Sequence, residues 1–537
     1  MRRLCLTFAF LALVASACSG TDTAITSSPV TGSTDASVRG SVAASTTSTT
    51  LVATTDGVPS STVGEASPAV DGSLPLHWGQ CGPDNPHIHD GDAECASLTV
   101  PLDHDDPDAG TIDLALARRR AKVSDERIGV LLYNPGGPAA SGTNVVLDTW
   151  WSDVFSSELA RRFDIVSWDP RGVSEGTEVF CGDEILPIVD PTPETPEEVE
   201  HNEGLYRDFI AACVEQSRHL LPHMSTVSTA RDMDLIREAL GEEQISYLGQ
   251  SYGAGLGAVY ATLFPDRVRA AVLDGAFTFT ETDSSPEVSA ADKALQEALE
   301  QCAADIECPF HSSGDPFTAF DDLMESLDTD PLTVDDFEVG LADALFAVRL
   351  DLYYEERWPD VMQTLADARD GDGSGMTLLR WGRTNSSYAY LAMDCLDRSR
   401  RRPEQADTPA EQPPAGATGL ARFRGQEVDF CSMWPVEPDP PPSLTAAGAG
   451  PILAIGTTGD IATTLAKARE LVDELEDGVL LVVERNAHTA YQPRHLGSAV
   501  KDTQCVTSTV DNYLINLITP ANGSICTHGD PELKPAE

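Results

Sequence analysis

The sequence Gly-Gln-Ser-Tyr-Gly at residues 249–253 constrains this chain more than any other segment. An apolar run at 245–248 precedes it and a small-residue helical pattern at 254–263 follows it, which predicts a strand, a sharp turn and a helix. Such a turn lifts the serine hydroxyl off the sheet, where a histidine can take its proton. We therefore interpret Ser251 as a candidate nucleophile; the alternative is a glycine-rich turn with an inert serine.

A second turn, upstream of the first, offers backbone donors for an oxyanion. The apolar strand pattern of residues 128–133 runs into Asn-Pro-Gly-Gly-Pro at 134–138. Glycine amides in such a turn can face a developing oxyanion, and the amide of the residue after the nucleophile supplies the second donor. These considerations assign Gly137 and Tyr252 as the oxyanion donors. An ordinary Pro-Gly turn is the alternative.

Two further apolar strand patterns, at residues 451–456 and 479–483, lie near the end of the chain. The first ends at Thr-Thr-Gly-Asp, whose aspartate is Asp460, and a helical pattern at 463–474 separates the two. The second is followed by Asn-Ala-His, whose histidine is His488. An acid and a base are expected on the loops after the last two strands of such a sheet.

The chain order Ser251, Asp460, His488 predicts a catalytic triad. In it, Asp460 holds the imidazole tautomer and stabilises its protonated form, while His488 carries the proton. Asp274 is a rival acid because it follows the strand after the elbow helix. We favour Asp460, since its strand, helix and strand lead directly to the histidine.

Short motifs along the chain resemble those of a known family, the bacterial secreted tripeptidyl aminopeptidases of the α/β-hydrolase superfamily. This group is related to proline iminopeptidases and to mycobacterial envelope serine proteases. The resemblance extends from residue 78 to about residue 526, and it implies the same nucleophile, acid and base. Besides the neighbourhoods of Asp460 and His488, the matching segments are residues 95–103, 134–138, 168–172 (Trp-Asp-Pro-Arg-Gly), 230–234, 249–253, 264–268, 273–275, 395–397 and 431–435.

Two departures from the family pattern concern the turns around the candidate nucleophile. The family continues its Gly-Gly-Pro turn with glycine, whereas Ala139 and Ala140 follow here. A Cβ disfavours positive φ, so we expect a differently shaped oxyanion loop. After the elbow, Ala254 stands where the family often has threonine. Neither departure removes a catalytic group, but both leave the substrate preference open.

Alternating strand and helix patterns predict an α/β-hydrolase fold with a mostly parallel central sheet. We place the two parts of its core at residues 71–275 and 443–537, and a large, mainly helical lid at 276–442. In the family that the chain resembles, acidic groups of the lid hold the substrate ammonium. Glu355 or Glu356 is the corresponding candidate, and the alternative is an amphipathic helix with a charged face.

The first 18 residues have the pattern of an export signal: two arginines, an apolar run and small residues before Cys18. A cysteine in this place predicts a lipid anchor on Cys18; the alternative is cleavage after Ala17 and release. Residues 19–70 are rich in serine, threonine and alanine and cannot bury a core, so we expect a flexible tether. The chain is therefore predicted to be an envelope lipoprotein or a secreted protein.

Of the 12 cysteines, Cys5 leaves with the signal and Cys18 carries lipid, which leaves ten in an exported chain and favours five disulfides. The sequence carries neither paired C-x-x-C nor H-E-x-x-H spacing, so we predict no metal site and no cofactor. Sequence alone leaves the disulfide connectivity open. The family resemblance and proximity suggest the pairs Cys81 with Cys95, Cys181 with Cys213, Cys302 with Cys308, Cys395 with Cys431, and Cys505 with Cys526.

The formal net charge of −51 argues against nucleic acid and anionic membranes as partners, because both require basic patches. Contact with a membrane is expected only through lipid on Cys18, and no oligomeric state is predicted. The first functional hypothesis is an aminopeptidase that releases tripeptides from peptides with a free N-terminus. The second is a carboxylester hydrolase or lipase with the same triad, acting on envelope esters. The third is a surface binding lipoprotein with an inactive hydrolase fold.

Overall fold

The computed structural model describes residues 76–82, 92–148, 151–174, 176–182, 186–279, 285–335, 337–377, 385–398, 419–423, 429–491, 503–527 and 529–536. The predicted export signal, with Cys18, and the predicted tether at 19–70 lie outside the described residues. Among the helices that are described, none combines the length and apolar character needed to cross a bilayer.

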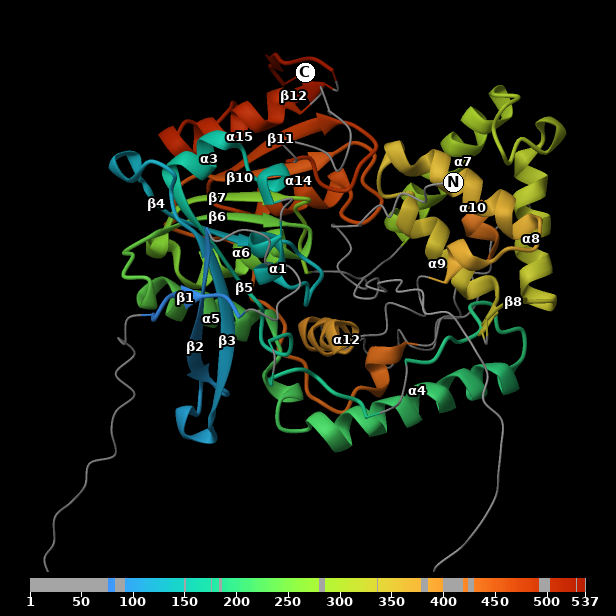
Figure 1. The fold of residues 1–537 in the computed structure, drawn as a ribbon, viewed down its shortest axis with the longest axis horizontal. Helices are drawn as coiled ribbons and strands as arrows, with labels where there is room; N and C mark the ends of the chain where they lie inside the picture. Colours follow the sequence, from blue (N-terminus) through green and yellow to red (C-terminus); the bar gives the residue numbers. More distant parts are fainter. Residues whose placement is uncertain are drawn as a thin grey trace, which may run out of the picture. The chain divides into compact units, whose positions relative to one another are not determined.

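An eleven-stranded sheet forms the core, in the order β1-β2-β3-β5-β4-β6-β7-β10-β11-β12-β13 (Figure 1). The strands from β5 to β12 in this order are parallel, and antiparallel strands extend the sheet at both edges. The predicted mostly parallel sheet is therefore confirmed. The strands are β1 (Gly79–Gln80), β2 (Ala93–Pro101), β3 (Thr111–Arg119), β4 (Gly129–Asn134), β5 (Phe163–Trp168), β6 (Ile245–Gln250), β7 (Val268–Asp274), β10 (Ile452–Thr457), β11 (Gly478–Glu484), β12 (Ser524–Thr527) and β13 (Leu533–Lys534).

The central strands are apolar on both faces because helices cover both sides of the sheet. All residues of β4, β6 and β10 are buried. Neighbouring residues of one strand, such as Leu131 and Leu132, belong to two different hydrophobic clusters, one on each face. The first cluster contains residues of α5 (Thr226–Ala239), α6 (Tyr252–Leu263) and α14 (Leu465–Glu474). The second contains residues of α1 (Gly142–Leu147), α2 (Trp151–Val154), α3 (Ser157–Arg162) and α15 (Gln504–Asn516).

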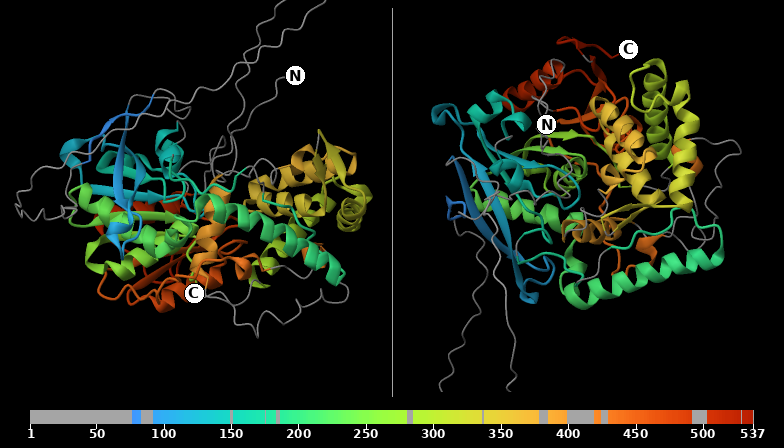
Figure 2. Two further views of the ribbon diagram at one scale, coloured as in Figure 1. Left: turned by 90° about the horizontal axis from the view of Figure 1, so that it is seen from below. Right: turned by 45° about the vertical axis from the view of Figure 1, so that its right-hand side comes forward.

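The predicted lid contains a group of four helices with a hydrophobic cluster of its own (Figure 2). A two-stranded sheet of β8 (Leu332–Val334) and β9 (Phe337–Val339) accompanies them. Ile461, which directly follows the candidate acid, is buried in the same cluster, so the lid packs on the candidate site. The helices are α7 (Ser285–Ala304), α8 (Pro316–Thr329), α9 (Leu341–Asp351) and α10 (Trp358–Arg369).

A second helical cluster joins the lid to a segment from before the elbow. Helix α12 (Asn385–Asp397) comes from the predicted lid, whereas the long α4 (Pro196–Ser217) comes from the first part of the core. Their buried side chains belong to one cluster, which also contains Ala139 of the predicted oxyanion turn. A capping box at Thr195 fixes the start of α4, since its side chain accepts from the Glu198 amide while Glu198 accepts from the Thr195 amide. The helical region therefore draws on chain outside 276–442.

Five disulfides crosslink the described chain, and they are the five pairs that the resemblance implied. They close loops of different lengths, from 6 residues between Cys302 and Cys308 to 36 residues between Cys395 and Cys431. A crosslink restricts the unfolded chain more when the loop is longer. The five disulfides are therefore expected to stabilise the fold to different extents.

Removal of the Cys505–Cys526 disulfide, which closes 21 residues, is expected to lower the free energy of unfolding by about 3 kcal/mol. Removal of Cys302–Cys308 is expected to lower it by about 2 kcal/mol, because the loop is shorter. Denaturant unfolding of the two paired Cys→Ala variants measures both losses. A larger loss for the short loop would contradict the loop-length argument.

Candidate active site

Ser251 lies in the sharp turn between β6 and α6, with φ 55 and ψ −125. A non-glycine residue rarely adopts positive φ, and such strain costs about 1–3 kcal/mol and persists only where packing imposes it. The packing is visible at Gly253, where an added Cβ would come within 2.5 Å of the Asn134 carbonyl oxygen. The Ser251 amide also donates to the Asp274 carbonyl at 2.8 Å. The elbow is thus held by both neighbouring strands, β4 and β7.

The predicted oxyanion turn lies against the elbow. An added Cβ at Gly136 would be 2.9 Å from the Ser251 Cβ and 3.2 Å from the Tyr252 amide nitrogen. Gly137 follows in the chain with φ 113, and the Asn134 side chain accepts from the Gly136 amide at 2.9 Å. Gly136, the neighbour of the predicted donor Gly137, therefore lies close to both Ser251 and the predicted donor Tyr252.

Ala139 adopts φ 68 although it carries a Cβ. The sequence led us to expect that alanine would avoid positive φ and change the turn. Instead, Ala139 is 1% exposed and packs in the cluster of α4 and α12, which holds the left-handed conformation. Ala139 therefore adopts a backbone conformation that favours glycine, and it does so while packed among the buried side chains of α4 and α12.

The Tyr252 side chain is anchored to the lid through two hydroxyls. Its hydroxyl contacts the Thr226 Oγ1, and Thr226 Oγ1 donates to the Asp397 Oδ2 at 2.6 Å. The Thr226 amide also donates to Asp397, at 2.8 Å. Burial raises the pKa of Asp397 to about 8. Helix α12 therefore reaches the residue whose amide is the second predicted oxyanion donor.

Asp460 and His488 form a buried hydrogen-bonded pair. The His488 Nδ1 lies 2.9 Å from the Asp460 Oδ2 and 3.0 Å from Oδ1, so Nδ1–H donates and Nε2 is left to accept a proton. Asp460 also accepts from the amides of Ala462 and Thr463, both at 2.8 Å. The Thr463 hydroxyl donates to Asp460 Oδ2 at 2.9 Å. The carboxylate is thus fixed in one orientation toward the imidazole.

The electrostatic environment favours the protonated imidazole. Burial lowers the pKa of His488, but the charge and hydrogen bond of Asp460 and the charge of Asp274 raise it, and the net direction is upward from 6.5. His488 is 7% exposed, so little water screens these charges. This environment suits a base that becomes a cation during a reaction.

Asp274, the rival acid, has a different role in the structure. Its carboxylate accepts from the amides of Ala490 and Tyr491, at 2.9 and 2.8 Å, and from the Gln250 side chain at 3.1 Å. Burial is the largest influence on its pKa and raises it. Asp274 therefore fixes the backbone just after His488, while Asp460 holds the ring.

Gly275 marks the point where the elbow meets the acid–base pair. An added Cβ there would lie 2.9 Å from the Thr463 Oγ1, 3.2 Å from the Thr489 Cγ2 and 3.5 Å from the Ser251 nitrogen. Thr489, which follows His488, Thr463, which contacts Asp460, and the backbone of Ser251 therefore all lie close to Gly275. The structure brings Ser251, Asp460 and His488 into one neighbourhood.

Glu355 and Glu356, the predicted ligands of a substrate ammonium, lie beside residues 485–488, the histidine loop. The Glu355 Oε2 is 3.2 Å from the Asn486 Nδ2, and the side chain is otherwise exposed. The Glu356 Oε1 accepts from the Arg485 Nη2 at 2.7 Å. Of the two carboxylates, the Glu355 side chain is the one without an ion pair to the histidine loop among the described contacts.

Three residues around the candidate triad were missed in the sequence analysis. Thr463 contacts Asp460, and Tyr353 contacts His488, whereas Arg485 pairs with Glu356. Thr463 could have been found, because a threonine three residues after an aspartate often bonds it in a turn. The contacts of Tyr353 and Arg485 join segments about 130 residues apart, so no local sequence pattern predicts them.

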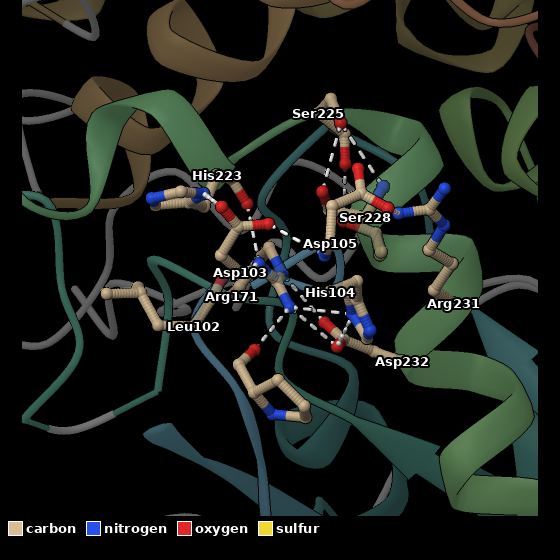
Figure 3. Close-up of polar contacts among 12 residues, drawn as sticks. Leu102, Asp103, His104, Asp105, Arg171, His223, Ser225, Ser228, Arg231 and Asp232 are labelled. Carbon is tan, nitrogen blue, oxygen red and sulfur yellow. Dashed lines mark hydrogen bonds and ion pairs between the residues drawn. The ribbon is translucent and has the colours of Figure 1, made fainter. Parts of the chain in front are cut away.

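Two other motifs, Trp-Asp-Pro-Arg-Gly and Ala-Arg-Asp-Met-Asp, meet in a buried ion pair (Figure 3). The Arg171 Nε and Nη2 donate to the two Asp232 oxygens at 2.8 and 2.7 Å, and neither side chain is exposed. Arg171 Nη1 donates to the carbonyls of Leu102 and His223. The pair connects the loop after β5 to α5, the helix that begins at Thr226, whose hydroxyl contacts Tyr252. Its role is structural.

Comparison with known proteins agrees with this geometry. The family described as "alpha/beta hydrolase fold" matches residues 129–306, and the one described as "TAP-like protein" matches residues 420–526. Ser251 lies in the first match, and Asp460 and His488 lie in the second. The two matches cover most of the core on both sides of the lid.

Relatives match most of the chain. The serine protease Hip1 of Mycobacterium tuberculosis is 31% identical over 489 residues, which are 84% of this chain and 91% of that protein. The tripeptidyl aminopeptidase of Streptomyces lividans is 30% identical over 468 residues, which are 82% of this chain and 84% of that protein. Carboxylesterase B of M. tuberculosis is 31% identical over 472 residues, which are 81% of this chain and 86% of that protein.

These relatives span nearly the whole described chain, and the sheet, the elbow and the disulfides are those that the family implies. The chain is therefore a serine hydrolase of the α/β-hydrolase fold that belongs to the family of the tripeptidyl aminopeptidases and the serine protease Hip1.

Proposed function

We propose that this protein is an exported aminopeptidase that releases tripeptides from free N-termini through an acyl-enzyme on Ser251. The observation that carries the proposal is the buried Asp460–His488 pair, which lies beside the strained elbow of Ser251 and leaves Nε2 to accept a proton. The names of the Hip1 and tripeptidyl aminopeptidase relatives support a peptide substrate.

In the proposed reaction, the His488 Nε2 takes the proton of the Ser251 hydroxyl as its oxygen attacks the peptide carbonyl. The carbonyl oxygen becomes an oxyanion and accepts from the amides of Gly137 and Tyr252. Asp460 stabilises the imidazolium, which then gives its proton to the leaving amine as the C–N bond breaks. Water hydrolyses the acyl-enzyme by the same steps, and the tripeptide leaves as a carboxylate.

The proposed selectivity for a free N-terminus resides in Glu355. Its carboxylate is exposed on the lid segment that pairs with the histidine loop, so a substrate ammonium bound there is held beside that loop. The net charge of −51 attracts a cationic N-terminus, and salt would weaken this attraction by screening it. Blocking the ammonium removes this attraction.

A carboxylester hydrolase is the second candidate function. Acyl transfer to a serine uses the same triad and oxyanion donors for esters and for amides. The relative named carboxylesterase B covers the chain as fully as the tripeptidyl aminopeptidase does. The two functions differ in the need for an ammonium group on the substrate.

The proposed location is the outside of the cell, with Cys18 carrying a lipid anchor. Five disulfides in the described chain support an oxidising compartment, because reducing conditions in the cytosol disfavour them. Palmitate labelling that is lost in Cys18→Ala would support the anchor, and unchanged labelling would exclude it.

Substrate profiling tests the peptidase proposal. The purified protein is expected to hydrolyse a tripeptide anilide and to lose most of this activity when the N-terminus is acetylated, because the ammonium no longer binds. Ser251→Ala is expected to lower kcat by about 10⁴–10⁶-fold. Turnover of a short-chain ester with none of the tripeptide anilide would favour the carboxylester hydrolase, and full peptidase activity in Ser251→Ala would exclude the proposed nucleophile.

Substitution of Glu355 tests the proposed ammonium site. Glu355→Gln keeps the size of the side chain and removes its charge, so KM for the free tripeptide anilide is expected to rise about 10-fold or more, as for the loss of one charge-assisted bond. Glu325→Gln is the matched control, since Glu325 is another exposed lid glutamate and is paired with Arg422. Equal KM values for the two variants would refute the assignment.

The pH profile tests the roles of His488 and Asp460. Catalysis requires the neutral imidazole, so kcat/KM is expected to fall as pH drops through the pKa of His488, with a midpoint above 6.5. Asp460→Asn removes the charge that raises this pKa, so the midpoint moves to lower pH and kcat falls by about 10⁴-fold. Asp473→Asn, on the exposed face of α14, is the control. An unchanged midpoint in Asp460→Asn would contradict the proposal that Asp460 raises the pKa of His488.

A further inference from the structure

A short lid segment, residues 353–356, pairs with the histidine loop, residues 485–488. The His488 amide donates to the Tyr353 carbonyl at 2.7 Å, and the Glu355 amide donates to the Asn486 carbonyl at 3.0 Å. Between these bonds, Tyr354 and Ala487 form an antiparallel bridge. The candidate base, His488, therefore takes part in this antiparallel pairing, because its own backbone amide donates to the lid segment.

Side chains reinforce this contact on one flank. The Arg485 Nη2 donates to the Glu356 Oε1 at 2.7 Å, with the arginine side chain 4% exposed. Its Nε and Nη1 are buried and have no hydrogen-bond partner among the described residues, so Glu356 is the group that compensates the charge. Asn486 Nδ2 lies 3.2 Å from Glu355 and 3.3 Å from Glu297 of α7. Separation of the lid segment from the histidine loop would leave the Arg485 guanidinium without the Glu356 carboxylate.

The Tyr353 ring contacts the imidazole itself. The centroids of the Tyr353 and His488 rings are 5.1 Å apart, and the ring planes meet at 64°. The imidazole Nδ1 is also hydrogen-bonded to Asp460. An edge-to-face contact of this kind limits rotation of the imidazole and excludes water from it. The ring thus has one support from the core and one from the lid.

The core alone leaves part of the histidine loop unsupported. Thr457 donates to the Ala487 carbonyl, and Asp274 accepts from the amides of Ala490 and Tyr491. The amide of His488 is satisfied by the lid carbonyl of Tyr353, not by a strand of the sheet. A displacement of about 1 Å at a reacting group can cost about 10²-fold in rate, so this support matters for proton transfer.

We infer that Tyr353 and the Glu356–Arg485 ion pair position His488 for proton transfer, so that the base is competent only while the lid is docked on its loop. Tyr353, Glu356 and Arg485 are positioning residues, because they act through His488 and not on the substrate. The inference rests on the proposed role of His488 as the base, but it holds whether the substrate is a peptide or an ester.

The test uses p-nitrophenyl acetate, which has no ammonium group and reports the base directly. Tyr353→Ala is expected to lower kcat about 10-fold or more with KM changed less than about two-fold, because alignment is lost and binding is not. Tyr353→Phe, which keeps the ring, is expected to restore most of the lost rate. The rate constant for labelling of Ser251 by a fluorophosphonate is expected to fall and recover in parallel. An unchanged kcat in Tyr353→Ala would overturn the inference.

The ion pair is tested by Glu356→Gln, with Glu325→Gln as a matched control because Glu325 also pairs with an arginine, Arg422, but within the lid. We expect Glu356→Gln to lower kcat for the ester by about 3- to 10-fold and Glu325→Gln to leave it unchanged. Thermal unfolding of each variant is measured first. If Tyr353→Ala does not fold, Glu356→Gln, which removes no packing volume, decides the case.

Equal kcat values for Glu356→Gln and Glu325→Gln would overturn the role of the ion pair. Failure of the proposed function has a different outcome: Ser251→Ala would then retain ester and peptide hydrolysis. Loss of activity in Ser251→Ala together with unaffected Tyr353→Ala and Glu356→Gln would leave the triad in place and refute the positioning role alone.

Discussion

One buried residue, Asp274, connects the elbow of Ser251, the side chain of Gln250 and the backbone that follows His488. Its backbone carbonyl accepts from the Ser251 amide, and its side chain accepts from Gln250 and from the amides that follow His488. The Gln250 amide also donates to the Tyr491 carbonyl, and its oxygen accepts from Tyr133 of β4. Each of these donors is buried and would be left unsatisfied without its partner, which is costly in a low dielectric. One network therefore fixes the elbow of Ser251, strand β4 and the backbone that follows the histidine loop relative to one another.

The strained backbone of the site is supported by this network and by the helical region. Ser251 and Ala139 both have positive φ without being glycine, at a cost of about 1–3 kcal/mol each. Ser251 is confined between β4 and β7, whereas Ala139 is confined by α4 and α12. Because a lid helix also holds Tyr252 through Thr226 and Asp397, the oxyanion side of the site depends on lid packing as much as the base does.

Features with a local signature could be predicted from the sequence. The elbow, the strands and the mostly parallel sheet follow from apolar runs bounded by glycines. The order of the last strands also predicts that Asp460 and His488 follow the carboxyl ends of two neighbouring strands, β10 and β11. The disulfide pairs followed from the family resemblance. The pairing of 353–356 with 485–488 could not be predicted, because a single antiparallel bridge has no periodicity and joins distant segments. The conformation of Ala139 was expected to differ because a local preference was applied where tertiary packing decides.

Glu355 and Glu356 are adjacent in the chain but make different contacts. Glu355 is exposed and contacts Asn486, while Glu356 is paired with Arg485. A peptide that binds Glu355 therefore engages the same segment that supports His488, so its binding energy can also stabilise the docked lid. For peptides, changes in this segment would then alter KM and kcat together. An ester without an ammonium group makes no such contact, so its kcat reports the alignment of the base alone.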